Sequence, residues 1–271
     1  VSIQSPEEPP VFAARLLTKT RLKVELPSLD MRLATTRGTN ALLEEKGAKT
    51  VFFVTKGFGD LLKIGNQQRP DLFELGIQKA DPVYTRVVEV EERLDSEGKV
   101  LRSLDERGLV QEIEKCRAEG IESAAVALLH SYLDPKHERR LKTLLRDNGI
   151  ERVSLSSELS PFIKILPRAE TANVDAYLSP IMDAYLDAVE GRLSGGKLRV
   201  MNSAGGLTSR RPYRPKDSLL SGPAGGAVGA SSLGKRAGEL RTIAVDMGGT
   251  STGLSRFDGE VHYTFAPPNG V

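Results

Sequence analysis

Short apolar runs that alternate with amphipathic helices constrain the fold of this chain more than any other feature of its sequence. Residues 49–55 (KTVFFVT) and 122–132 (ESAAVALLHSY) are apolar runs of strand length, and both predict buried strands. Alternating apolar and polar residues predict another strand over 84–93. The full predicted order is strand 84–93, helix 105–120, strand 122–132, helix 135–149 and strand 151–159. This order indicates a mainly parallel α/β sheet.

The flanking segments are predicted by the same rules. Toward the N-terminus we expect a strand over 9–20, a second strand that ends within 31–36, and a helix over 39–47 closed by Gly47. Toward the C-terminus we expect, in order, a long helix over 169–193 that contains Pro180, a strand beginning at 197, a glycine-rich turn leading into a helix over 218–238, and a strand–turn–strand unit from 242. The change of character near residues 165–170 predicts two domains, 1–167 and 168–271.

The composition excludes several classes of function. With 38 basic and 36 acidic residues, the 271-residue chain has a net charge of +2, which provides no broad basic surface for nucleic acid or an anionic membrane. No stretch approaches the roughly 20 apolar residues of a membrane-spanning helix. A single cysteine, Cys116, cannot form an internal disulfide or a cysteine-based metal site, and we expect a cytoplasmic protein. Because the chain begins with Val1, we interpret it as a piece of a longer protein.

The turn within residues 242–252 (TIAVDMGGTST) carries the strongest candidate for a site. An apolar strand delivers Asp246 to its end, and two glycines then let the backbone approach a ligand closely. Successive N–H groups there can point at phosphate oxygens, and Asp246 is suited to hold a hydrated Mg²⁺ ion. The candidate phosphate-binding residues are Gly248, Gly249, Thr250, Ser251 and Thr252. The alternative is an ordinary β-hairpin turn that contains Gly-Gly.

Polar glycine turns recur elsewhere in the chain. The turn SGPAGG (221–226) is neither a Walker A loop nor a Rossmann fingerprint, and tight helix–sheet packing is an equally good interpretation. The turn MNSAGG (201–206) follows a predicted strand, as does TTRGTN (35–40), where capping of the next helix is the alternative. The candidate residues in these turns are Gly222 and Gly225, Asn202 and Ser203, and Thr36 and Asn40. Turns of this kind predict a cleft at strand ends.

The remaining candidates are weaker. The histidines His130, His137 and His262 show no metal-ligand spacing with one another. His130 ends an apolar run, and we interpret it as a buried, hydrogen-bonded residue rather than a catalytic one. Glu158 stands at another predicted strand end, and Cys116 lies on a charged helix where a structural role is favoured.

Six segments together resemble the hydantoinase A/5-oxoprolinase family and follow its order over most of residues 31–258. They are TTRGTNALLEEKGAKT, LLKIGNQQRPDLFEL, VALLHSYLDPKHE, SLSSELSPFIKILPRAETANVDAYLSP, SGPAGGAVGA and DMGGTST. The resemblance implies an actin-like (ribonuclease H-like) ATPase fold of two α/β lobes, with ATP and Mg²⁺ in the cleft. It also implies the ATP-dependent opening of a cyclic amide such as 5-oxoproline or a hydantoin. The implied partner is a hydantoinase B-type subunit or fused segment, and homo-oligomer formation stays open.

The resemblance also implies roles for the candidate residues. Asp246 would organise Mg²⁺, and Gly248 to Thr252 would surround the phosphates of ATP. Gly222 and Gly225 would border the nucleotide, whereas the substrate-facing residues would be Thr36, Asn40, Asn202 and Ser203.

Two departures from the family pattern leave alternatives open. The family has a D-x-G-G-T loop near its N-terminus, and none precedes Asp246 here. The family also places an aspartate after the second threonine of GGTST, where this chain has Gly253. The alternatives are a subunit of an acetone- or acetophenone-type carboxylase with the same ATP chemistry, a non-catalytic assembly module with a degenerate cleft, and a dinucleotide-binding oxidoreductase.

Overall fold

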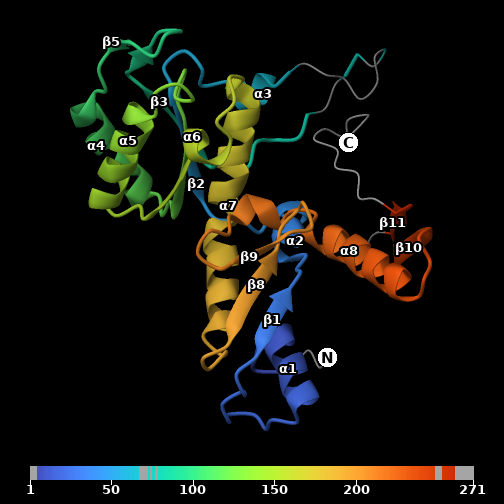
Figure 1. Ribbon diagram of the computed structural model, residues 1–271. Helices are drawn as coiled ribbons and strands as arrows, with labels where there is room; N and C mark the ends of the chain where they lie inside the picture. Colours follow the sequence, from blue (N-terminus) through green and yellow to red (C-terminus); the bar gives the residue numbers. More distant parts are fainter. Residues whose placement is uncertain (1–4, 67–72, 74, 77–78, 248–251, 260–271) are drawn as a thin grey trace. The chain divides into compact units, whose positions relative to one another are not determined.

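The computed structural model describes residues 5–66, 73, 75–76, 79–247 and 252–259. The chain divides into two compact units (Figure 1). Unit 1 combines Val1–Asn40 with Ala184–Val271, and unit 2 is Ala41–Asp183. The helices α2 (Arg37–Leu43) and α7 (Ile165–Glu190) each contribute residues to both units.

Unit 2 is built on a four-stranded sheet in which every pair of neighbours is parallel. The strand order is β3-β2-β6-β7, with bounds β3 Arg86–Val90, β2 Thr50–Thr55, β6 Ser123–Ala127 and β7 Arg152–Leu155. Every residue of β2 and β6 is buried, as expected for central strands that are covered on both faces. The predicted parallel α/β sheet is therefore confirmed.

Helices cover both faces of this sheet. Helices α4 (Glu106–Ala118) and α5 (Lys136–Asp147) pack on one face, where Phe53 lies in the core. Helix α7 packs on the other face through small alanine side chains that contact Phe52. Successive side chains of a strand point to opposite faces, which is why these two phenylalanines enter different cores. Figure 1 shows α4 and α5 together on one side of the sheet. A short hairpin of β4 (Arg93–Leu94) and β5 (Val100–Arg102) and the one-turn helix α3 (Leu61–Ile64) complete unit 2.

The structure corrects several of the predicted elements. The helix predicted over 39–47 ends at Leu43, and Gly47 does not adopt the left-handed conformation expected of it. Residues 9–20 form a helix, α1 (Pro9–Thr18), instead of a strand, because prolines suit a first helical turn and Val11, Ala14 and Arg15 share its buried face. The strand predicted over 122–132 ends at Ala127, where buried polar side chains bind the backbone that follows. The strand predicted over 151–159 ends at Leu155 and is followed by the short helix α6 (Ser156–Leu159).

Unit 1 holds a three-stranded sheet of order β1-β8-β9. Strand β1 (Asp30–Leu33) is parallel to β8 (Lys197–Met201), which pairs antiparallel with β9 (Leu207–Ser209). A 3₁₀ turn (Pro215–Ser218) leads to helix α8 (Ser221–Arg236), which contacts both β8 and a C-terminal hairpin. The hairpin pairs β10 (Thr242–Met247) with β11 (Thr252–Phe257).

One face of the β10–β11 hairpin packs on α8, and the other is apolar and exposed. Phe257 is buried, and the Nζ of Lys235 on α8 lies 5.0 Å from the centre of its ring. The exposed side chains are Ile243, Val245, Met247 and Leu254, each more than 60% accessible.

A buried network of charged and hydroxyl groups links the strand ends of unit 2. Glu138 and Arg168 are both fully buried, with 3.9 Å between Arg168 Nη1 and Glu138 Oε1. The carboxylate of Glu138 accepts hydrogen bonds from Leu128 N at 2.9 Å and Ser157 N at 2.9 Å. The guanidinium of Arg168 donates to Leu128 O at 3.1 Å. Burial lowers the pKa of Arg168, and the nearby Glu138 carboxylate opposes this shift.

We expect Glu138→Ala to destabilise this chain by about 3–5 kcal/mol, because it leaves the Arg168 guanidinium buried without its counter-charge. Urea denaturation followed by circular dichroism measures the loss. The matched control is Glu106→Ala, which removes a half-exposed ion pair with Arg140 and should change stability by about 1 kcal/mol or less. Equal losses in the two variants would contradict a structural role for the buried pair.

Candidate functional site

In unit 1, two of the predicted polar turns meet at one edge of the β1-β8-β9 sheet. Strands β1 and β8 are parallel, and Leu33 is the register partner of Val200. The backbone that leaves β1 at Thr35–Thr36 therefore emerges beside the backbone that leaves β8 at Asn202–Ser203. The carboxyl ends of parallel strands are where open α/β sheets bind ligands.

The segment before α8 is tied to both turns. The Ser221 hydroxyl donates to Thr35 O at 2.9 Å, and the Ser203 hydroxyl donates to Asp217 O at 2.9 Å and also to Leu219 O. Leu220, just before the helix, adopts a left-handed conformation with φ of 61°. Helix α8 begins at Ser221, so the helix predicted within 218–238 is confirmed. The glycine run that was expected to form a turn before it lies within the helix, and that part of the prediction was wrong.

Gly222 and Gly225 bring the backbone of α8 close to the sheet edge. A Cβ at Gly222 would lie 2.9 Å from Thr36 Cγ2, and a Cβ at Gly225 would lie 3.0 Å from Ala34 Cβ. Close packing, one of the two interpretations made from the sequence, therefore accounts for both glycines. Their contact with a nucleotide stays a prediction.

The polar side chains at this edge differ in how far they are already engaged. Asn202 Oδ1 accepts from the N–H groups of Ala204 and Gly206 within its own turn. Thr36 and Asn40 are exposed, and Asn40 N donates to Thr36 O at 2.8 Å at the start of α2. Helix α8 begins beside this edge, and no side chain caps its N-terminus. Such an arrangement suits an anion, because helix N-termini carry partial positive charge.

The predicted phosphate loop is only partly within the described residues. Asp246 lies in β10 and is the register partner of Gly253 in β11, while Thr252 pairs with Met247. Gly248, Gly249, Thr250 and Ser251 lie outside the described residues. The family aspartate that Gly253 replaces would therefore stand directly across the hairpin from Asp246.

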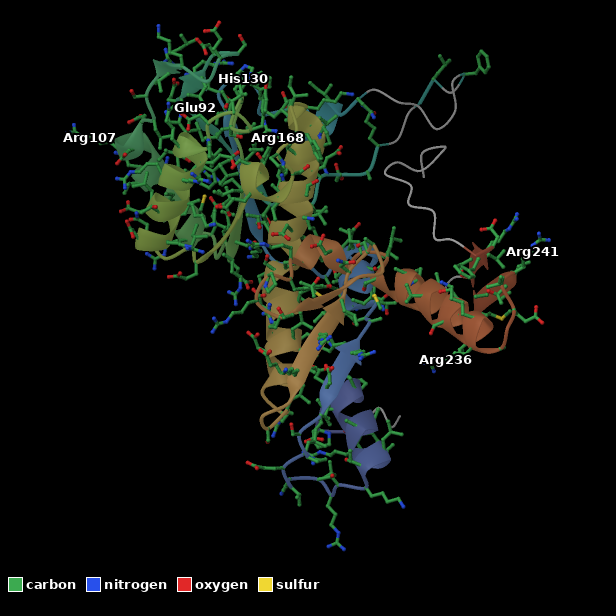
Figure 2. The ribbon with its side chains drawn as sticks, viewed as in Figure 1. Glu92, Arg107, His130, Arg168, Arg236 and Arg241 are labelled. Atoms are coloured by element: carbon green, nitrogen blue, oxygen red, sulfur yellow. The ribbon has the colours of Figure 1, made fainter. Side chains whose placement is uncertain are left out.

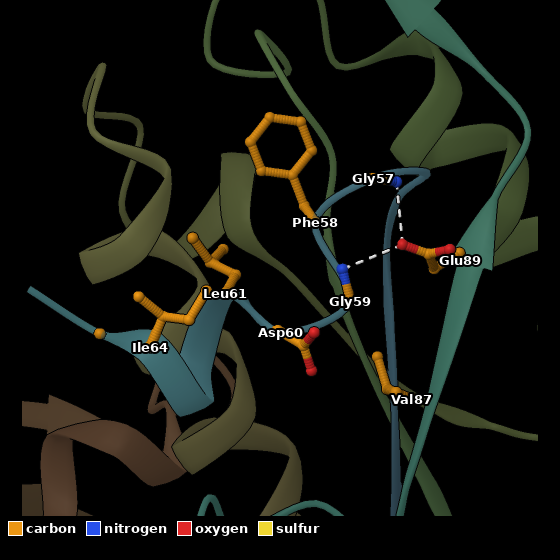
Figure 3. Close-up of a pocket in the computed structure, with 9 residues that line it drawn as sticks. Gly57, Phe58, Gly59, Asp60, Leu61, Ile64, Val87 and Glu89 are labelled. Atoms are coloured by element: carbon orange, nitrogen blue, oxygen red, sulfur yellow. Dashed lines mark hydrogen bonds between the residues drawn. The ribbon is translucent and has the colours of Figure 1, made fainter.

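Unit 2 holds a pocket that the sequence analysis did not single out (Figure 3). Its volume is about 630 Å³, and its lining comes from the β2–α3 loop, α3 and β3. The apolar wall is Phe58, Leu61, Ile64 and Val87, and the acidic residues are Asp60 and Glu89. Glu89 Oε1 accepts hydrogen bonds from Gly57 N at 2.8 Å and Gly59 N at 3.0 Å, so its own carboxylate occupies this pair of donors. The signal in the sequence was KGFGD, two glycines flanking an aromatic residue directly after a buried strand.

The histidines of unit 2 differ sharply from each other. His137 is buried, and its Nδ1 lies 2.6 Å from Glu92 Oε2. His130 is half-exposed, and its Nδ1 is buried without a hydrogen-bond partner among the described residues. Its φ of 59° places the backbone in the left-handed region. The prediction of a buried, hydrogen-bonded His130 was therefore wrong. Glu158 forms an ion pair with Lys142 at 2.9 Å.

The described residues contain neither a metal-binding cluster nor a membrane-spanning helix. Within the part of the chain that the structure describes, no group of three or more His, Cys, Asp or Glu side chains is placed to hold a metal ion. No helix in those same residues is long and apolar enough to cross a membrane.

Comparison with known proteins identifies the family. The hydantoinase/oxoprolinase N-terminal region matches residues 17–149, and the hydantoinase/oxoprolinase region matches residues 168–269. The 5-oxoprolinase 1 of Arabidopsis thaliana is 42% identical over 253 residues, which cover 84% of this chain and 20% of that protein. The chain therefore belongs to the hydantoinase/oxoprolinase family, and it spans about a fifth of the length of this relative.

Two solved structures share the fold. A nucleotide-free structure of acetone carboxylase, from a study of ATP-dependent acetone carboxylation, superposes with a TM-score of 0.73 at 24% identity, over 86% of this chain and 36% of that one. The ATP-dependent caprolactamase of Pseudomonas jessenii superposes with a TM-score of 0.68 at 28% identity, over 82% of this chain and 34% of that one. Both support a mixed α/β fold, in line with the parallel and antiparallel sheets described above.

The close packing at Gly222 predicts a strong dependence on side-chain size. Gly222→Ala should destabilise the chain by about 1–3 kcal/mol through its clash with Thr36 Cγ2. The second change Thr36→Ser removes that methyl group and should recover most of the loss. Gly226→Ala is the matched control on the same helix, because a Cβ there meets nothing within 4 Å. It should stabilise by about 0.5–1 kcal/mol, and thermal unfolding distinguishes the three variants.

Cys116 should be unreactive in the folded chain at pH 8. Its side chain is completely buried in α4, and burial raises the pKa of the thiol to about 11. A thiol reagent such as Ellman's reagent should therefore label it only after denaturation, because the thiolate is the reacting form. Rapid labelling under native conditions would show that α4 opens readily.

Proposed function

We propose that this chain is part of an ATP-dependent enzyme that opens a cyclic amide. Membership of the hydantoinase/oxoprolinase family, at 42% identity to a 5-oxoprolinase, is the observation that carries the proposal. The similarity to an ATP-dependent caprolactamase supports the same substrate class, a ring that contains an amide bond. The substrates we propose are 5-oxoproline, hydantoins and related ring amides.

The chemistry requires activation of an unreactive carbonyl. Transfer of the γ-phosphoryl group of ATP to the amide oxygen, with release of ADP, makes the carbonyl carbon more electrophilic, so that water can add to it. The ring C–N bond then breaks, the nitrogen leaves as an amine, and a second water releases the phosphate from the new carboxyl group. Catalysis of this transfer rests on positioning and on neutralising negative charge. In this proposal the N–H groups and hydroxyls of residues 248–252 hold phosphate oxygens. Gly222 and Gly225 border the nucleotide at the start of α8, and Thr36, Asn40, Asn202 and Ser203 lie toward the substrate.

The metal proposed for this site is Mg²⁺, held by Asp246 through water. Magnesium accepts one or two carboxylates and retains several waters, and a single carboxylate at the end of β10 next to a hydroxyl-rich loop fits that donor set. When bound, Mg²⁺ neutralises charge on the phosphates. Gly253, the register partner of Asp246, supplies no second carboxylate. Of these two positions, only Asp246 would hold the ion.

We further propose an actin-like ATPase fold of two lobes for the whole protein. Residues 1–167 would belong to the first lobe region, and residues 168–271 would begin the core domain that contains the phosphate loop. A hydantoinase B-type subunit or fused segment would complete the enzyme. This arrangement is consistent with a chain that spans only a fifth to about a third of its relatives. A cytoplasmic location fits the single reduced cysteine.

An ATP-dependent carboxylase is the second candidate function. The similarity to the acetophenone carboxylase gamma subunit of Aromatoleum aromaticum, 28% identical over 274 residues, favours it. A non-catalytic assembly module is the third, favoured by the absence of a second carboxylate at Gly253. Full-length protein with its B-type partner should be assayed for ATP hydrolysis with 5-oxoproline, hydantoin, caprolactam, or acetone with bicarbonate. ATP hydrolysis stimulated by acetone with bicarbonate, and by none of the ring amides, selects the carboxylase. ATP hydrolysis that none of these compounds stimulates selects the assembly module.

Asp246→Asn should weaken Mg²⁺-dependent ATP binding by at least about tenfold in the full-length enzyme, because it removes the charge proposed to hold the ion. Isothermal titration with ATP in the presence and absence of Mg²⁺ measures the effect. Asp258→Asn is the matched control, since Asp258 follows the same hairpin and lies 3.2 Å from the guanidinium of Arg256. Unchanged Mg²⁺–ATP affinity in Asp246→Asn would contradict the assignment.

A further inference from the structure

The pocket of unit 2 (Figure 3) combines an apolar wall with negative charge. Its volume of about 630 Å³ lies within the range of pockets that bind small molecules. Its lining includes two acids, Asp60 and Glu89, which we call the pocket carboxylates, and no basic residue among the nine that are described. The lining therefore carries two formal negative charges and no positive one, and a cation is the ligand that would neutralise it.

Neither pocket carboxylate forms an ion pair among the described residues. Two other acids of unit 2, both buried, each lie beside a base. Glu92 Oε2 is 2.6 Å from His137 Nδ1, and Glu138 Oε1 is 3.9 Å from Arg168 Nη1. Figure 2 shows Glu92 and Arg168 among the side chains of this unit. The fold thus provides these buried acids with counter-charges and provides none to the pocket carboxylates.

The bases nearest to the pocket are engaged with other groups. Lys56 forms an ion pair with Glu91. The guanidinium carbon of Arg93 lies 5.7 Å from the centre of the Phe58 ring, and its Nη2 donates to Lys56 O at 3.3 Å. Lys79 Nζ donates to a backbone carbonyl of α3 at 2.6 Å. None of these three basic side chains lines the pocket, so none takes the place of a cationic ligand.

The carboxylate of Glu89 is fixed by the backbone of the β2–α3 loop. Its Oε1 accepts from Gly57 N at 2.8 Å and from Gly59 N at 3.0 Å (Figure 3). These bonds orient the carboxylate without neutralising it, and Oε2 has no partner among the described residues. Asp60 makes no side-chain hydrogen bond there either. Both acids are exposed, so a ligand can reach oxygens that are free to accept.

The charge of Asp60 acts on the interior beside the pocket. The ring of Tyr84 stacks on Phe52 with 5.8 Å between their centres, and its hydroxyl oxygen is buried without a hydrogen-bond partner among the described residues. Burial raises the pKa of the Tyr84 hydroxyl, and the carboxylate of Asp60 raises it further. Apolar surroundings screen a charge less than water does. The field that disfavours a phenolate at Tyr84 favours a cation in the pocket.

The apolar wall favours an organic cation over a metal ion. Within the residues that the structure describes, no group of three or more metal-ligating side chains is placed to hold a metal. A hydrated metal ion gains nothing from Phe58, Leu61 and Ile64, whereas an aliphatic chain packs against them and leaves water. An ammonium group has three donors, which match the free carboxylate oxygens.

We propose that this pocket binds a primary amine on an aliphatic chain. Asp60 and Glu89 hold the ammonium group, and Phe58, Leu61 and Ile64 cover the methylenes. Small alkylamines carry such a group, and so do the lysine side chains of other proteins. The proposal concerns unit 2 alone and does not rest on the proposed function.

Saturation-transfer-difference NMR on the full-length protein tests the proposal, because it detects weak binding to a large protein without turnover. Pentylamine, protonated at pH 7, should receive saturation along its chain. Pentanol has the same chain without the charge and should bind at least about fivefold more weakly. Ethylamine keeps the charge but lacks three methylenes, and it should bind about tenfold more weakly. Equal binding of pentanol and pentylamine would overturn the proposal.

Two variants remove one pocket charge each with little change of size. Glu89→Gln retains an oxygen that can accept from Gly57 and Gly59, and Asp60→Asn disturbs no hydrogen bond of the described residues. Each should weaken pentylamine binding by at least about fivefold and leave the thermal midpoint nearly unchanged. If Glu89→Gln fails to fold, Asp60→Asn decides alone.

Glu122→Gln is the matched control, because Glu122 is an exposed acid of the same unit outside the pocket lining. It should bind pentylamine as the wild type does. Wild-type affinity in the folded pocket variants would contradict the proposal, as would an equal loss in the control.

Two further probes identify the kind of cation. Nα-acetyl-lysine amide presents a lysine side chain. Binding at least as tight as that of pentylamine supports a lysine of a partner protein as the natural ligand, and weaker binding supports a small alkylamine. Calcium ions should displace pentylamine no better than sodium chloride at the same ionic strength. Stronger displacement by calcium would mean a site for a divalent metal and would overturn the proposal.

Discussion

A carboxylate and a guanidinium that are both fully buried lie at the strand ends of unit 2, and the local backbone depends on them. Glu138 satisfies N–H groups that would otherwise be left unpaired where β6 and β7 end, and Arg168 satisfies the carbonyl of Leu128. Unpaired backbone groups inside a protein are strongly unfavourable. The buried ion pair therefore determines where β6 and β7 end, and it shapes the turn that contains His130.

The central elements of unit 2 were predictable because their signals are local. The burial of every residue in β2 follows from an uninterrupted apolar run, and α4 and α5 follow from helical periodicity. The ends of β6 and β7 were not predictable. They depend on Glu138 of α5, a helix that lies between the two strands in the sequence. No local pattern within either predicted strand indicates that this carboxylate will bind its end. Helix α1 was mispredicted because the short apolar run VFAARLL does not by itself distinguish a helix from a strand, and Glu7, the ion-pair partner of Arg15, lies outside that run.

The candidate site of unit 1 was predicted as separate turns, and the parallel pairing of β1 with β8 brings two of them together. What the sequence could not provide was the reason for the glycines. Close packing and nucleotide binding both require that position 222 has no side chain. Only the distance to Thr36 shows that close packing is enough to explain the glycine. The pocket beside β3 was missed because its lining comes from elements separated by more than 20 residues, and Gly57 and Gly59 are engaged by Glu89.

Helix α8 contains five glycines among its sixteen residues, which gives it a low intrinsic tendency to be helical. A segment of this composition is helical because of what it packs against, since each interior glycine favours the unfolded chain. Its backbone amides should consequently open at lower free energy than those of α4 or α5. Any molecule that binds at the start of α8 would stabilise the whole helix by mass action, and slower amide hydrogen exchange along it would then reveal occupancy of the site.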